Sequence, residues 1–151
     1  MSRAKKSLGQ NFLHDPTTIC RILEFGRIQP GESLFEIGPG RGALTRTLLE
    51  ISGDLVALEL DAELAREPLA HLFGKYPRAR LLIGDVRNFD PRAVEGFGRR
   101  KVFGNLPYGL ATHLILKYAE PEWRRLFSDM IFMVQREVAD RIRARPRSRA
   151  G

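Results

Sequence analysis

The chain has 151 residues and a mass of 17.1 kDa, and 43% of its residues are hydrophobic, which suits a single domain with one sizeable core. One cysteine, Cys20, excludes an internal disulfide and is typical of a reducing compartment, so we expect a cytoplasmic protein. The apolar run at residues 130–134 is too short to span a bilayer, and the basic N-terminus leads into no apolar signal segment. The three histidines are scattered without metal-ligand spacing, and we expect no metal.

The net charge of +7 is concentrated at the two ends of the chain. Eight of the 25 lysines and arginines lie in terminal stretches that contain no acid, and the chain between them has one more acidic residue than basic residues. Such arms suit a phosphate backbone, because neutralising its charges releases counterions. Solvated tails have the same composition, so the charge pattern leaves both interpretations open.

Along the chain, amphipathic segments alternate with short apolar ones. Asp15 followed by Pro16 predicts a helix start, and Gly26 predicts its end. A helix is expected over residues 61–73, where Pro68 could introduce a kink, and further helices are expected at 111–118 and from 137. Strands are expected at residues 34–37, 55–58, 81–83, 102–103 and 130–134. Continuous apolar strands between helices predict an α/β protein with a mostly parallel, doubly wound sheet.

Polar residues follow four of the predicted strands. Glu36 and the loop at Gly38, then Glu59, Asp85 and Asn105, all fall at or just beyond carboxyl ends of strands. Open α/β sheets place their ligand crevice at that edge. The sequence therefore predicts a binding site there.

The loop at residues 38–43 fits the dinucleotide-binding fingerprint, with Glu59 21 residues beyond Gly38 to bind ribose hydroxyls. A nicotinamide-dependent dehydrogenase is therefore one candidate. Two residues count against it, because Glu36 places a carboxylate at the mouth of the loop and Pro39 removes an N–H that a pyrophosphate would use.

S-adenosylmethionine tolerates both features, since it has no phosphate and has cationic groups. Gly38 and Gly40 would admit its methionine part closely. Glu59 could accept from the ribose diol, and Asp85 could accept from the adenine amine.

The corner formed by residues 105–108 suits a flat ring that bears an amine. The amide oxygen of Asn105 and the carbonyl of Leu106 can accept from an exocyclic amine, Pro107 stiffens the bend, and Tyr108 offers a face for stacking. A simple strand-ending turn has the same composition.

With these motifs in view, the chain resembles the ribosomal RNA adenine N6-dimethyltransferase family, in particular its small-subunit branch. The resemblance rests on residues 8–13, 36–40, 59–61, 84–85, 105–108 and 132–141. It implies a Rossmann-like S-adenosylmethionine-dependent methyltransferase that dimethylates adjacent adenines near the 3′ end of small-subunit rRNA, as a monomer acting on the immature small ribosomal subunit. The resemblance also implies site residues. Asn105, Leu106, Pro107 and Tyr108 would be catalytic, and the cofactor would be bound by Asn11, Leu13, Gly38, Gly40, Glu59, Asp85 and Asn105.

The chain departs from the family pattern in two places. Gly109 stands where relatives commonly have Asn, and the chain stops at Gly151, where relatives continue with two more strands and a helical C-terminal domain. We therefore expect a truncated enzyme: a basic segment at 1–14 that contributes to the cofactor site, a methyltransferase domain at 15–143 and a basic tail at 144–151. A non-catalytic RNA-binding or ribosome-assembly module and a large-subunit rRNA adenine methyltransferase remain alternatives.

Overall fold

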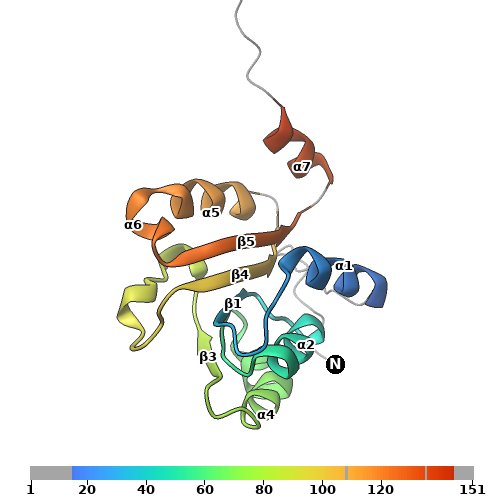
Figure 1. Cartoon of the computed structure of the whole chain (residues 1–151), viewed down its shortest axis with the longest axis vertical. Coiled ribbons are helices and arrows are strands. Elements are labelled where there is room, and N and C mark those ends of the chain that lie inside the picture. Colours follow the sequence, from blue (N-terminus) through green and yellow to red (C-terminus); the bar gives the residue numbers. More distant parts are fainter. Residues whose placement is uncertain (1–14, 108, 135, 145–151) are drawn as a thin grey trace, which may run out of the picture.

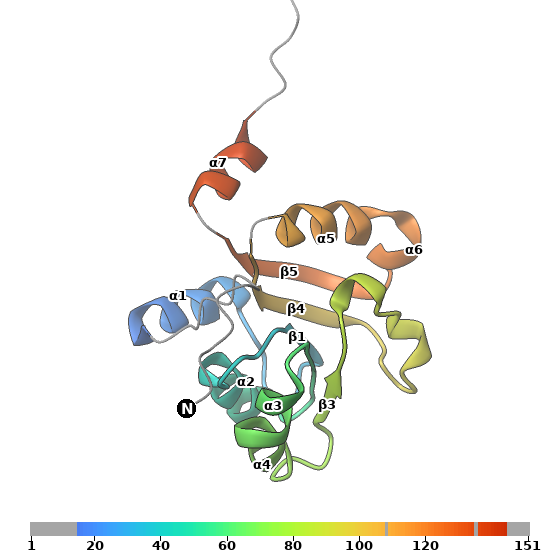
Figure 2. The same cartoon turned by 180° about the vertical axis from the view of Figure 1, so that it is seen from behind.

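The five strands form one parallel sheet in the order β3-β2-β1-β4-β5 (Figures 1 and 2). The structure is a computed structural model that describes residues 15–107, 109–134 and 136–144. The strands are β1 (Leu34–Ile37), β2 (Leu55–Glu59), β3 (Arg80–Ile83), β4 (Arg100–Asn105) and β5 (Phe127–Met133). The central strands β1 and β2 are buried along their whole length, as expected for a sheet covered on both faces.

Helix α1 (Pro16–Gly26) begins as the sequence predicts. The Asp15 carboxylate accepts a hydrogen bond from the backbone N–H of Thr17, at 3.0 Å, and Pro16 occupies the first turn. The left-handed residue after the helix is Arg27, with φ 44°, rather than a glycine. Gly26 is required for another reason: a Cβ at this position would lie 2.8 Å from the ring of Phe103.

The predicted helix over residues 61–73 is divided into three pieces: α3 (Ala62–Leu64), η2 (Ala65–Leu69) and α4 (Ala70–Phe73). Glu67 has φ −150° and ψ 132°, which is extended, and its peptide bond to Pro68 is cis. The proline ring disfavours a helical conformation of the preceding residue, so the kink is a full interruption. Helix α2 (Ala43–Ser52) forms over the segment between the glycine loop and β2, flanked by the left-handed Gly42 and Gly53.

The remaining elements lie mainly in the second half of the chain. Two short 3₁₀ turns, η3 (Val86–Asn88) and η4 (Pro91–Ala93), connect β3 to β4 and were not predicted. They are followed by α5 (Leu110–Ala119), α6 (Pro121–Arg124) and α7 (Arg136–Arg143). Strand β5 begins at Phe127 rather than at residue 130, and Ser128 and Asp129 are exposed. As an edge strand, β5 needs no continuous apolar run.

Two apolar cores lie on the two faces of the sheet. One contains side chains of α5 and α6 with Phe35, Val56 and Val102. The other contains side chains of α1, α2 and α4 with Leu34 and Phe103. Because alternate strand residues point to opposite faces, neighbouring residues of β1 belong to different cores. Within the described residues, no helix has both the length and the apolar character needed to cross a membrane.

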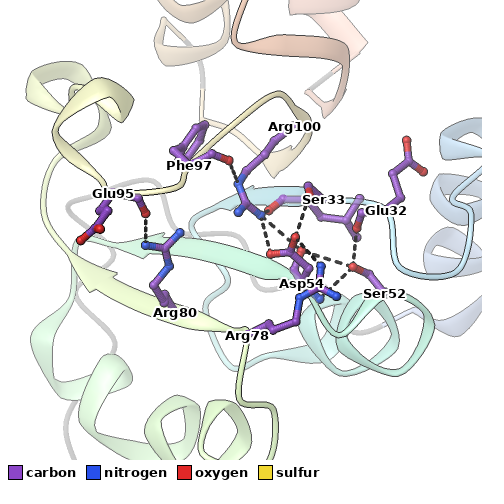
Figure 3. Close-up of polar contacts among 10 residues, drawn as sticks. Glu32, Ser33, Ser52, Asp54, Arg78, Arg80, Glu95, Phe97 and Arg100 are labelled. Atoms are coloured by element: carbon purple, nitrogen blue, oxygen red, sulfur yellow. Dashed lines mark hydrogen bonds and ion pairs between the residues drawn. The ribbon is translucent and has the colours of Figure 1, made fainter.

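Strand β4 begins two residues earlier than expected, with the buried Arg100 and Lys101. The Arg100 guanidinium donates to Asp54 Oδ1 at 3.0 Å, to the Leu34 carbonyl at 3.0 Å and to the Phe97 carbonyl at 2.6 Å (Figure 3). Lys101 Nζ similarly lies 2.9 Å from the carboxylate of Glu32. These partners come from distant segments, which explains why two cations can begin a buried strand.

Asp54 is the anionic centre of this group at the amino ends of the strands. Its carboxylate also accepts from Ser33 Oγ at 2.6 Å and from the Arg78 guanidinium at 3.0 Å (Figure 3). Burial by itself would raise the pKa of Asp54, but the hydrogen bonds from Ser33 and Arg100 and the charge of Arg100 outweigh burial and lower it. The group stabilises the edge of the sheet opposite the candidate site.

Candidate functional site

The predicted polar residues lie at the carboxyl ends of four neighbouring strands. In spatial order across the sheet they are Asp85 after β3, Glu59 at the end of β2, Gly38 after β1 and Asn105 at the end of β4. Chain order and spatial order differ, yet the four ends form an uninterrupted row. The row includes the neighbouring pair β1 and β4, where the strand order reverses and open α/β sheets place their crevice.

The glycine loop after β1 has a conformation that only glycine adopts easily. Gly38, Gly40 and Gly42 have φ values of 68°, 60° and 87°. The Gly38 N–H donates to the Leu58 carbonyl at 2.9 Å, which joins the loop to β2. A Cβ at Gly38 would meet no atom of the described residues within 4 Å, so these residues leave space beside the loop, as a cradle for a ligand requires.

Glu59 holds the backbone of this loop. Its side chain is buried, and Oε2 accepts from the N–H of Gly40 at 2.9 Å while Oε1 accepts from the N–H of Asp61 at 3.0 Å. Sequence reasoning assigned Glu59 to ribose hydroxyls and missed this role, since the spacing alone does not show which N–H groups approach the carboxylate. The ribose role stays a prediction.

Glu36 lies behind the loop and is 3% exposed. Its Oε2 accepts a hydrogen bond from Thr45 Oγ1 of α2 at 2.7 Å. Burial raises the pKa of Glu36 to about 8, and the nearby charge of Glu59 adds to the effect, although the Thr45 hydrogen bond opposes it. The carboxylate expected at the mouth of the loop is therefore a buried group that is largely protonated at neutral pH.

Asp85 is ionised and paired with Arg87. Its carboxylate accepts from the backbone N–H of Arg87 at 3.0 Å and from the guanidinium Nη2 at 3.0 Å. The side-chain hydrogen bonds of Arg87 lower the pKa of Asp85. Sequence reasoning missed Arg87, which follows two residues later in a 3₁₀ turn.

The corner that follows β4 lies beside a cavity of about 510 Å³. Asn105 is half-buried and Leu106 is buried, and the Leu106 N–H donates to the Met133 carbonyl of β5 at 3.0 Å. A Cβ at Gly104 would lie 2.9 Å from the Leu106 side chain, so the glycine allows that side chain to fold back. The described residues that line the cavity are Thr18, Arg21, Ile22, Phe25, Asn105, Leu106, Pro107, Ile131, Phe132, Met133, Val134 and Ala139.

The α1 face of this cavity was missed by sequence reasoning. Thr18, Arg21, Ile22 and Phe25 recur at helical spacing and therefore share one face of α1. That spacing is visible in the sequence, but the sequence does not show that the face lies beside Asn105. The predicted site residues Asn11, Leu13 and Tyr108 lie outside the described residues. Within the part of the chain that is described, no group of three histidine, cysteine or acidic residues could hold a metal ion.

The fold is similar to that of several solved structures. A dimethyladenosine transferase from Plasmodium falciparum has a TM-score of 0.75 and 26% identity over 89% of this chain and 47% of that chain. The 23S rRNA methyltransferase ErmE has a TM-score of 0.69 and 26% identity over 85% of this chain and 50% of that one. The chain therefore has the Rossmann-like fold of the S-adenosylmethionine-dependent methyltransferase class.

The chain belongs to the ribosomal RNA adenine dimethylase family, whose profile matches residues 1–150. Two similar relatives are both named ribosomal RNA small subunit methyltransferase A. The one from Geobacter metallireducens is 41% identical over 95% of this chain and 52% of its own length. The one from Pseudomonas aeruginosa is 44% identical over 95% of this chain and 53% of its own length. The family resemblance is therefore confirmed, and the chain spans about half the length of these curated relatives.

Proposed function

We propose that the chain transfers methyl groups from S-adenosylmethionine to N6 of adjacent adenines near the 3′ end of small-subunit rRNA. The observation that supports this most is the corner at Asn105, which borders a cavity and stands in one row with the Gly38 loop. The names of relatives at 41% and 44% identity favour the small-subunit substrate over the large-subunit one. We expect a monomer that acts in the cytoplasm on the immature small ribosomal subunit, during ribosome biogenesis.

The residues of the row fit the proposed cofactor. The open side of Gly38 admits an extended group close to the backbone, and Gly40 is fixed by its bond to Glu59. Ionised Asp85 provides an acceptor for an amine group rather than a donor that a pyrophosphate needs, whereas Glu36 is buried behind the loop and does not face the ligand as a charge. When bound, S-adenosylmethionine supplies an activated methyl group.

The role proposed for the corner is to make a poor nucleophile reactive. The lone pair of an adenine amine is delocalised into its ring. An acceptor at the Asn105 amide oxygen and another at the Leu106 carbonyl would bind the amine hydrogens and favour a lone pair localised on nitrogen. The hydrogen bond from Leu106 N–H to β5 fixes the position of these acceptors, so that catalysis depends on positioning and electrostatics.

The target base must leave its stack to reach this corner, because the amine is inaccessible inside a duplex. We propose that Tyr108 stacks on the extruded base and that Pro107 stiffens the bend. Asn11 and Leu13 are proposed to contact the cofactor from the N-terminal segment. A second transfer to the same nitrogen requires space for the first methyl group, and a cavity of about 510 Å³ offers it.

The test is methyl transfer from radiolabelled S-adenosylmethionine to immature small-subunit particles. We expect transfer by the parent chain and a loss of at least a hundredfold for Asn105→Ala, since one preorganised hydrogen-bonding group is typically worth about that factor. Gln29→Ala is the matched control, because it removes an exposed amide side chain remote from the corner. Unchanged transfer by Asn105→Ala would refute the assigned role.

Titration calorimetry with S-adenosylmethionine separates the alternatives. Binding of the cofactor without transfer, together with salt-dependent RNA binding, would indicate a non-catalytic assembly module. Transfer to large-subunit but not small-subunit rRNA would replace the proposed substrate. Preferential binding of NADH would refute the cofactor.

A further inference from the structure

One face of α1 contributes an unusual pair of side chains to the cavity. Arg21 and Phe25 are one helical turn apart, so they lie next to each other on the helix surface. Ile22, on the same face, is buried in the core, whereas Phe25 is 80% exposed although it lines the cavity. An exposed aromatic ring and a guanidinium therefore stand together at the cavity mouth.

The composition of the lining indicates the kind of ligand. Among the described lining residues, Arg21 has the only charged side chain, and none is acidic. The other lining residues are apolar except for Thr18 and Asn105. An apolar cavity with a single cation at its mouth complements a ligand that combines a flat ring with one negative group.

A single exposed phenylalanine is common on protein surfaces and indicates nothing alone. Phe25 differs because its ring borders the same cavity as Asn105, which we propose to contact the target amine. The cavity volume, about 510 Å³, lies within the range of about 300–1,000 Å³ for pockets that enclose whole small molecules. It therefore has room for more than the reacting amine.

We propose that the Arg21–Phe25 face binds the nucleotide next to the target adenosine in single-stranded RNA. Its base would stack on the Phe25 ring and its phosphate would pair with the Arg21 guanidinium. Stacking on an aromatic ring tolerates any base, so this contact supplies affinity and positioning rather than sequence readout. The inference rests on the proposed function and adds two residues that hold the substrate strand.

The test compares Phe25→Ala and Phe25→Trp in the full 151-residue chain. We expect Phe25→Ala to raise the KM for immature small-subunit particles about tenfold, which corresponds to one stacked base. The dissociation constant for S-adenosylmethionine should stay within twofold, and Phe25→Trp should retain the parent KM. Leu116→Ala is the matched control, because Leu116 is an exposed apolar residue of α5, on the other face of the sheet.

Arg21→Ala should weaken binding of a single-stranded RNA oligonucleotide and reduce the salt slope of log K by about one, as expected for one lost phosphate contact. Arg124→Ala, which removes an exposed arginine of α6, should leave that slope unchanged. The oligonucleotide contains 2-aminopurine beside the target adenosine, and stacking on Phe25 should quench its fluorescence in the parent but not in Phe25→Ala.

Two results would overturn the inference while the proposed function stands. The first is parent-like KM and quenching for Phe25→Ala in a chain that transfers methyl groups. The second is a loss of cofactor affinity or thermal stability in Phe25→Ala with no change in KM, which would show that another part of the chain covers Phe25. Absence of transfer by the parent itself would instead refute the proposed function.

Discussion

Replacing Glu36 with glutamine should remove a pH dependence that the buried carboxyl imposes on folding. The pKa of Glu36 rises from an ordinary 4.5 to about 8 in the folded protein, chiefly through burial. Between these values the folded chain holds a proton that the unfolded chain has lost. Stability therefore falls as pH rises through this window, by about 1.4 kcal/mol per pH unit.

The expected magnitude follows from that slope. From pH 5 to pH 7 the residue should cost the parent about 2.7 kcal/mol of unfolding free energy, and above pH 8 the cost should level off. Glutamine keeps an oxygen that can accept from Thr45 Oγ1, but it brings a second N–H that needs a partner, at a cost of about 1 kcal/mol. We expect Glu36→Gln to be slightly less stable than the parent at pH 5 and more stable by about 3 kcal/mol at pH 8.

Urea denaturation followed by circular dichroism at pH 5, 6, 7 and 8 measures both curves. All other titrating groups are common to the two proteins, so the difference between the curves isolates Glu36. Glu50→Gln is the control, because it neutralises an exposed carboxylate on the same helix α2 and should follow the parent. A difference between Glu36→Gln and parent that does not vary with pH would refute the assignment of a buried, protonated carboxyl.

Further substitutions at two positions, Arg100 and Glu59, each with a matched comparison, test the groups at opposite edges of the sheet. Arg100→Ala should lower the free energy of unfolding by about 3–5 kcal/mol in urea denaturation, since it leaves Asp54 buried without its main cation. Arg78 pairs with the same carboxylate, but its side chain is 68% exposed, so Arg78→Ala should cost less than about 1 kcal/mol. Because the pKa of Asp54 is lowered in the folded state, its contribution to stability should be present above its ordinary pKa of 3.8 and be lost as pH falls below that value. Equal losses of stability in the two arginine variants would contradict the assignment of Arg100 as the main cation. Glu59→Ala should lower the free energy of unfolding by about 1–3 kcal/mol for each backbone N–H left without an acceptor. It should also raise the calorimetric dissociation constant for S-adenosylmethionine about tenfold, and Glu59→Gln should have an intermediate effect. An unchanged dissociation constant would argue against a role of Glu59 in the site.

The amino ends of the strands serve stability, and the carboxyl ends form the candidate binding site. At the amino ends, Arg100 and Asp54 satisfy each other and nearby backbone groups in a buried cluster (Figure 3). At the carboxyl ends, the glycine loop and the Asn105 corner border open space and a cavity. A substitution at the first edge should therefore change unfolding free energy, while one at the corner should change transfer with little effect on folding.

Local patterns in the sequence were sufficient to predict the fold class and the strand ends. Apolar runs bounded by turns identified all five strands, because a strand covered on both faces of a parallel sheet requires such a run, although β4 and β5 begin earlier than these runs predicted. The acidic and amide residues at the carboxyl ends of the strands were also identified as site residues, because each closely follows its apolar run in the sequence. The family motifs are likewise short contiguous segments, so the sequence alone indicated the family that the profile match confirmed.

Only the tertiary structure decided what surrounds these residues. The protonation of Glu36 depends on burial against α2, and the role of Glu59 depends on a loop about twenty residues away. The cation at the start of β4 is tolerated because Asp54, just before β2, lies next to it. Phe25 lines the Asn105 cavity because α1 packs beside β5. Each depends on contacts between segments far apart in the chain, and desolvation and hydrogen bonding arise from those contacts rather than from local spacing.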